Sequence, residues 1–126
     1  MASSASNKSL AARAAAILTT GEVAATAMDL NEAWGGNVNV QLDFTIGSLT
    51  NVIVKFYVSM DGTTYVPIAA PTGAVMTETV TATATRAYAV GNLAGWKFFR
   101  ATLTGTGTVT SSSATLTYRY LRRGSQ

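Results

Sequence analysis

Side chains able to do chemistry are few in this sequence of 126 residues. It contains no histidine and no cysteine, which excludes a Ser-His-Asp triad, a Cys-His dyad and metal sites built from imidazole or thiolate. A glycosidase needs two carboxyl groups held at a set separation in a cleft, and the sequence singles out no such pair. We therefore expect neither an enzyme nor a cofactor. The acids are Glu22, Asp29, Glu32, Asp43, Asp61 and Glu78.

Two short segments come close to ligand-binding motifs. Asp29, Asn31 and Glu32 carry oxygen ligands of the kind that Ca²⁺ prefers, but further oxygen donors are missing nearby, so no metal site is predicted. The string SMDGTTY (59–65) is similar to the Asp-box of sialidase-type propellers, yet it is one residue short and occurs once, whereas propellers repeat their units at a fixed period. We interpret it as a hairpin turn in which the Asp61 carboxylate accepts hydrogen bonds from N–H groups of the turn.

The aromatic side chains allow two interpretations. A carbohydrate-binding platform needs exposed rings beside polar side chains, whereas rings that fill a core are buried. In the second interpretation, Trp96, Phe98 and Phe99 fill the core and Trp34 covers its end. The platform would draw on Trp34, Tyr57, Tyr65, Tyr88, Trp96, Tyr118 and Tyr120.

Positive charge gathers near the two ends of the sequence, whose net charge is +3. Lys8 and Arg13 lie near the start, and Arg119, Arg122 and Arg123 lie near the end. All the acids lie between these two groups. Such ends favour an acidic partner, and the alternative is that they aid solubility. No helix-turn-helix or base-stacking motif points to nucleic acid, and no run of about 18 apolar residues points to a membrane.

Alternation of apolar and polar residues with period two runs from Val38 to Ile46 and again from Val52 to Val58. It predicts strands with one face in a core and one in water. Further strand-like segments, with Gly and Pro turns between them, predict an all-β fold: an antiparallel β-sandwich of seven or eight strands, immunoglobulin-like or jelly-roll. We expect one core that contains Val38, Val40, Leu42, Phe44, Ile46, Val54, Phe56 and Val58.

The start of the sequence differs in composition, since it is rich in Ala and Ser. We expect residues 1–18 to form an N-terminal arm or a short helix, and residues 19–126 to form the sandwich domain. An extended arm of this length would reach about 60 Å onto a neighbour and would order on binding. The alternative is a short helix folded back on its own sandwich. The candidates for binding a partner are Lys8, Leu10, Arg13, Ile17, Leu18, Arg122 and Arg123.

The order of four segments resembles a known group of proteins. These segments are ILTTGEVAATAMDL (17–30), VKFYVSMDGTTYVPI (54–68), WKFFRATLTGTG (96–107) and ATLTYRYLRR (114–123). Together they resemble small β-sandwich virion structural proteins of tailed bacteriophages, of the kind that decorate or cement a capsid.

This resemblance implies a role in the virion without catalysis. The expected function is capsid decoration, in which the chain binds and stabilises the shell. The expected partners are the major capsid protein or other virion proteins, and further copies of this chain in a homo-oligomer. The alternatives are a tail, head–tail connector or shell component, and a carbohydrate-binding module for host attachment.

Overall fold

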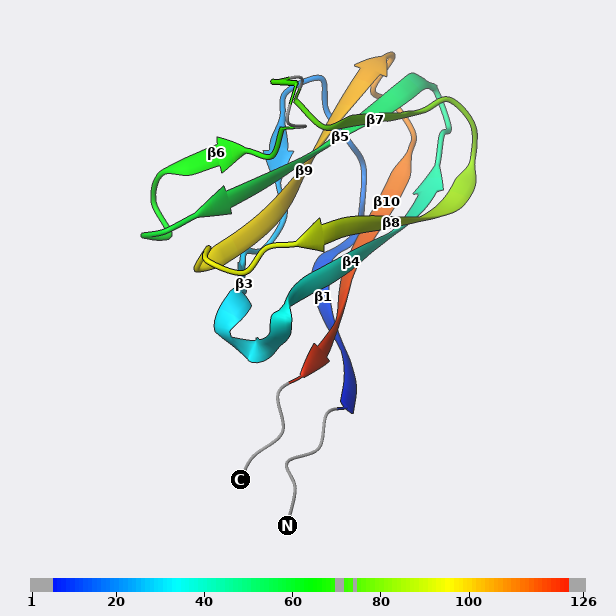
Figure 1. The fold of residues 1–126 in the computed structure, drawn as a ribbon. Coiled ribbons are helices and arrows are strands. Elements are labelled where there is room, and N and C mark those ends of the chain that lie inside the picture. The colour runs from blue at the N-terminus through cyan, green and yellow to red at the C-terminus, as the bar shows by residue number, and fades with distance from the viewer. Residues whose placement is uncertain (1–5, 70–71, 74, 123–126) are drawn as a thin grey trace.

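Two antiparallel sheets pack face to face in this chain (Figure 1). The computed structural model describes residues 6–69, 72–73 and 75–122. The first sheet has four strands in the order β1-β10-β4-β8. Their bounds are Ser6–Ala16 for β1, Ser113–Arg122 for β10, Ala33–Thr45 for β4 and Ala84–Asn92 for β8.

The second sheet has six strands and is built around β5 and β9. Its order is β2-β9-β5-β6, with β3 also paired to β9 and β7 also paired to β5. A short 3₁₀ helix, η1 (Leu30–Glu32), leads from β3 into β4. The strand bounds are Val23–Ala24 for β2, Met28–Asp29 for β3, Leu49–Ser59 for β5, Tyr65–Pro67 for β6, Thr77–Val80 for β7 and Phe98–Gly107 for β9.

The predicted antiparallel β-sandwich is confirmed, and its strands are shorter and more numerous than expected. Residues 23–29 contain two short strands, β2 and β3, which both pair with β9. The Thr-rich segment at residues 77–85 is divided between the two sheets, because β7 pairs with β5 while β8 pairs with β4 in the other sheet. The chain crosses between the two sheets at residues 81–83.

The apolar alternation of β4 and β5 places one face of each strand in the core. The predicted core is confirmed, since every expected member except one is at most 3% exposed. The exception is Ile46, which is partly buried and packs against the core. The confirmed members are Val38, Val40, Leu42, Phe44, Val54, Phe56 and Val58.

An aromatic stack connects the sheets inside this core. The ring of Phe56 stacks on that of Phe99, with centroids 6.2 Å apart, and Phe99 meets Tyr118 edge-on at 5.1 Å. The backbone N–H of Ala101 on β9 donates to the Tyr118 hydroxyl at 3.0 Å, so a β10 side chain is hydrogen-bonded to the opposite sheet. Burial raises the pKa of the Tyr118 phenol, which stays protonated.

Residues 6–16, expected to belong to an arm or a short helix, are strand β1 of the sandwich. Their pairing with β10 runs from Ser6 opposite Arg122 to Ala16 opposite Ala114. Ala and Leu favour helices in isolation, but pairing with β10 satisfies the backbone groups on one side of β1, and Ala12 is buried to 4% exposure. Residues 6–18 are therefore part of the body, and a domain boundary at residue 18 is wrong for them. Residues 1–5 lie outside the described residues.

The turn predicted at residues 59–65 is present. The Asp61 carboxylate accepts hydrogen bonds from the N–H groups of Thr63 and Thr64, both at 2.8 Å, and from the Ser59 hydroxyl at 3.0 Å. The bonds from Thr64, Thr63 and Ser59 hold the pKa of Asp61 below its usual value. Gly62 has φ +78°, a conformation that glycine adopts without steric cost. The Asp61 side chain is therefore occupied by its own turn.

Candidate partner-binding surface

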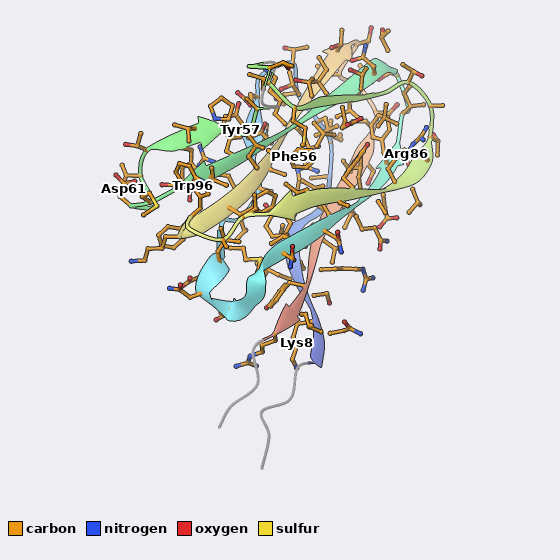
Figure 2. The ribbon with its side chains drawn as sticks, in the orientation of Figure 1. Lys8, Phe56, Tyr57, Asp61, Arg86 and Trp96 are labelled. Carbon is orange, nitrogen blue, oxygen red and sulfur yellow. The ribbon has the colours of Figure 1, made fainter. Side chains whose placement is uncertain are left out.

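Strands β1 and β10 project together from one end of the sandwich as a twisted ribbon (Figure 1). Lys8 lies opposite Tyr120, and Ser9 lies opposite Arg119. Figure 2 shows Lys8 at the end of this ribbon, away from the bulk of the side chains. Basic residues from both ends of the sequence therefore meet on two neighbouring strands, although they are far apart along the chain.

A hollow of about 550 Å³ lies where the ribbon meets β4, and we call it the basic trough. Its charged lining residues, Lys8 and Arg119, are both positive. Neither forms an ion pair with a carboxylate of residues 6–69, 72–73 or 75–122. The trough therefore carries two positive side chains that have no ion-pair partner among the described residues. The full lining is Asn7, Lys8, Ser9, Asn37, Asn39, Arg119, Tyr120 and Leu121.

A chain of polar side chains holds Arg119 in place on the outer face of the four-stranded sheet. Its Nε donates to Oε1 of Gln41 on β4 at 3.1 Å. Nε2 of Gln41 lies 3.3 Å from Oδ2 of Asp43, to which it donates. The hydroxyl of Thr85 on β8 donates to Oδ1 of Asp43 at 3.0 Å. Fixing a guanidinium in this way reduces the side-chain entropy that binding a partner would cost.

One acid borders the inner side of the ribbon. The hydroxyl of Tyr120 donates to Oε2 of Glu32 at 3.5 Å. Burial and the nearby Glu32 carboxylate raise the pKa of Tyr120, and the Arg122 charge lowers it. Glu32 thus lies on the face of the ribbon that carries Tyr120 and its cross-strand partner Lys8.

The structure brings some of the predicted partner-binding residues to this surface. Lys8 and Arg122 are exposed, and Ile17 is 53% exposed further along the edge. Leu10 is partly buried and packs against the core. Arg123 lies outside the described residues.

Two of the predicted anchors serve the chain's own fold, which corrects the expectation. Leu18 is fully buried, and its N–H donates to the Ser112 hydroxyl at 3.0 Å. The Arg13 guanidinium donates to the backbone carbonyls of Ala16, Ile17 and Ala114. It ties the irregular end of β1 to β10, where the register shifts on both sides of Arg13. Its donors are therefore used within the chain.

Arg119 and the asparagines of the trough were not among the sequence candidates. Arg119 lies between Tyr118 and Tyr120, so the alternation along β10 already indicates that it faces away from the core. Asn39 lies beside it because β4 pairs with β10 in the register Asn39 opposite Arg119. That register is not readable from either segment alone.

A second polar cluster lies on the outer face of the six-stranded sheet, and we call it the Glu22 cluster. Oε2 of Glu22 accepts hydrogen bonds from the Tyr57 hydroxyl and the Thr102 hydroxyl, both at 2.6 Å. The Arg100 guanidinium lies over the ring of Tyr65, 3.9 Å from its centroid. These five residues and Ala24 line a hollow of about 200 Å³.

Hydrogen bonding controls the charge state within this cluster. The bonds from Thr102 and Tyr57 hold the pKa of Glu22 below its usual value, because they stabilise the carboxylate. Burial and the Glu22 carboxylate raise the pKa of Tyr57. At neutral pH the pair is therefore an ionised acid and a protonated phenol.

The Glu22 carboxyl group is expected to titrate with a midpoint below 4.5, its ordinary value. A depressed pKa in the folded state means that the ionised group stabilises the fold above its unfolded pKa, and that this stabilisation is lost as the pH falls through the folded pKa. Carboxyl ¹³C chemical shifts measured against pH give the midpoint directly. The stability difference between wild type and Glu22→Gln should shrink over the same pH range. A midpoint at or above 4.5 would contradict the assignment.

The other candidates from the sequence have structural roles or lie apart. Asp29 accepts a hydrogen bond from the backbone N–H of Asn31 at 2.9 Å and caps η1. Tyr118 is buried in the core, whereas Trp96 is 40% exposed. Tyr118 is therefore not available to the predicted aromatic platform, and the side chain of Trp34 lies outside the described residues. Tyr57 and Tyr65 come together in the Glu22 cluster.

No group of three or more Asp or Glu side chains in residues 6–69, 72–73 and 75–122 is placed to hold a metal ion. Within the same ranges, no helix is long and apolar enough to cross a membrane.

Comparison with known proteins bears on the fold. No protein-family model matches the sequence, and no curated protein matches it. Among solved structures, the SPBc2 prophage-derived protein YomS is similar, with a TM-score of 0.56 and 13% identity over 96% of this chain and 97% of that one. A protein of Bacillus endospore appendages, which form disulfide-linked pili, has a TM-score of 0.56 and 12% identity over 95% and 90% of the two chains.

A third similar structure is CBM32-1 from a family 31 glycoside hydrolase of Clostridium perfringens. Its TM-score is 0.47, with 14% identity over 88% of this chain and 75% of that one. At the identities of the first two structures, the similarity shows a shared β-sandwich fold. None of the three is described as a capsid decoration protein. The resemblance expected from the sequence is therefore confirmed for the fold, with a prophage-derived protein among the similar structures.

Proposed function

We propose that this protein is a structural subunit of a tailed-phage virion, and specifically a capsid decoration protein that binds and stabilises the assembled shell. It attaches through the basic trough and the exposed end of the β1–β10 ribbon. The partner surface is acidic and belongs to the major capsid protein or another virion protein. The mechanism is binding energy alone, because a ligand that binds the assembled state stabilises that state by mass action.

The observation that carries this proposal is the unpaired positive charge at the ribbon. Lys8, Arg119 and Arg122 lie on two adjacent strands, and the described carboxylates form no ion pair with any of them. A surface of one sign accelerates encounter with a surface of the opposite sign and sets the orientation of docking. The similarity to a prophage-derived protein, which covers nearly all of both chains, supports a phage origin.

Association between copies belongs to the same proposal. In the described part of the chain, β8 has β4 on one side and no strand on the other. Its single charged residue is Arg86, so little charge protects this edge against pairing. We therefore expect a homo-oligomer, formed in solution or on the particle.

Removing two charges from the ribbon is expected to weaken binding to the particle by about tenfold. The variant is Lys8→Gln with Arg122→Gln, because both side chains are exposed and no bond within the described fold depends on them. Binding is measured by co-sedimentation with purified particles that lack the protein. The affinity of the wild type should also fall as salt is raised, since salt screens exposed charges.

A matched variant, Arg86→Gln with Lys97→Gln, removes the same charge elsewhere and should bind within about twofold of the wild type. Equal losses for both variants would mean that net charge matters and the ribbon does not. Wild-type protein that fails to bind the particles would contradict the proposal outright. A few copies per particle, confined to the tail or the vertex that joins it, would indicate a tail or head–tail connector component.

A further inference from the structure

The Glu22 cluster lies on the sheet face that the proposed attachment does not use. The basic trough lies beside the outer face of the four-stranded sheet, and the Glu22 cluster is on the outer face of the six-stranded sheet. Figure 2 shows Tyr57 well apart from Lys8. A chain that docks through the ribbon therefore leaves this cluster accessible.

The Glu22 carboxylate is fixed on one oxygen and open on the other. Oε2 receives both the Tyr57 and Thr102 hydroxyls, and Oε1 makes no hydrogen bond within the described residues. Thr102 is 4% exposed, so its position is set by the strand. The hollow thus contains a charged acceptor whose geometry is established before any ligand arrives.

Arg100 supplies donors from across the hollow. Stacking on Tyr65 holds its guanidinium, and its Nε is buried without a hydrogen-bond partner. Its terminal nitrogens make no hydrogen bond in the described part of the chain. A buried donor without a partner costs free energy, and such groups in a folded protein call for an explanation. A role in ligand binding would explain why the Arg100 guanidinium is held in this position.

These groups define the chemistry of the ligand. The Glu22 carboxylate would repel an anion, and the Arg100 guanidinium would repel a cation, so a neutral ligand fits best. Each hydroxyl of a polyol both donates and accepts a hydrogen bond, so two adjacent hydroxyls can donate to Glu22 and accept from Arg100. The hollow, at about 200 Å³, is smaller than the range of about 300–1,000 Å³ typical for drug-sized ligands, which limits the ligand to one small ring.

We propose that the Glu22 cluster binds a neutral monosaccharide unit through two adjacent free hydroxyl groups. This site goes beyond attachment to the shell and does not depend on it. If no sugar binds the Glu22 cluster, the proposed attachment through the β1–β10 ribbon is unaffected, because the two sites share no residue.

Titration of the full chain with neutral sugars tests this inference. The probes are the methyl glycosides of glucose, galactose and mannose, added in the millimolar range to ¹⁵N-labelled protein. At least one sugar should shift the amide signals of Ala24, Tyr65, Arg100 and Thr102, with signals of the basic trough unchanged. Shifts located elsewhere, or no shift with any of the sugars, would overturn the proposal.

Two variants test the named groups. Glu22→Gln removes the charged acceptor and Arg100→Lys removes the planar fork, and each should weaken sugar binding about tenfold or more. The matched controls Glu78→Gln and Arg86→Lys should bind as the wild type does. Unchanged binding in both cluster variants would contradict the assignment. Inorganic phosphate and acetate are tested as well, and shifts caused by these anions without any caused by sugars would show an anion site instead.

Discussion

The substitution Phe56→Ala is expected to lower the free energy of unfolding by about 3–5 kcal/mol. Phe56 is fully buried on β5, where its ring stacks on Phe99 and meets Tyr88 edge-on at 5.8 Å. Alanine would leave a cavity bounded by side chains that two sheets hold in place. Since domains are stable by about 5–15 kcal/mol, this single change removes a large part of the total.

Urea unfolding followed by circular dichroism measures this loss. Val66→Ala is a suitable control, because Val66 is 41% exposed on β6 and its truncation should change stability by about 0.5 kcal/mol or less. A loss below about 1 kcal/mol for Phe56→Ala would mean that β5 does not direct this face into the core.

Deletion of residues 2–16 is expected to prevent folding. It removes the whole of β1, which covers one edge of β10 and buries Ala12. It also removes Arg13, whose guanidinium bonds to three backbone carbonyls, and the carbonyl of Ala12, which accepts from the Thr26 N–H at 2.9 Å. The inner strand β10 would become an edge, and the core beneath Leu10 would open to water.

The deletion is assessed by the dispersion of amide signals and by thermal unfolding. Deletion of residues 2–5 is the matched control, since it leaves β1 intact and should retain a cooperative transition. A deletion of residues 2–16 that still unfolds cooperatively near the wild-type temperature would show that the segment is a dispensable arm after all.

Much of the fold follows from short-range patterns. Alternation with period two identified β4 and β5 and the side of each that is buried, because side chains on a strand point alternately to its two faces. The Asp61–Gly62 pair identified the turn, because its geometry depends on those residue types. Strand β1 was not identified, since a run of Ala favours a helix until β10 provides a partner. The partner is at the far end of the sequence, and no local pattern reports it.

The sites were less accessible to sequence reasoning. Lys8 and Arg122 were predicted from charge alone, and their role in binding stays a prediction. The role of Arg13 depends on carbonyl groups that only the folded chain brings near it. The Glu22 cluster unites residues from four separate segments of the chain. No single member indicates a site in the sequence. The members come together because the pairing of β5 with β9 places Tyr57 opposite Arg100.

The position of β10 has a consequence for how the protein is made. Among the described strands, β10 comes last in the sequence, yet it lies inside its sheet, between β1 and β4. Long loops must close before such pairings form, which slows folding. During synthesis on a ribosome, β1 and β4 cannot pair with β10 until residues 113–122 have emerged. Loss of residues 113–122 would therefore remove an inner strand and leave β1 without its partner in this sheet.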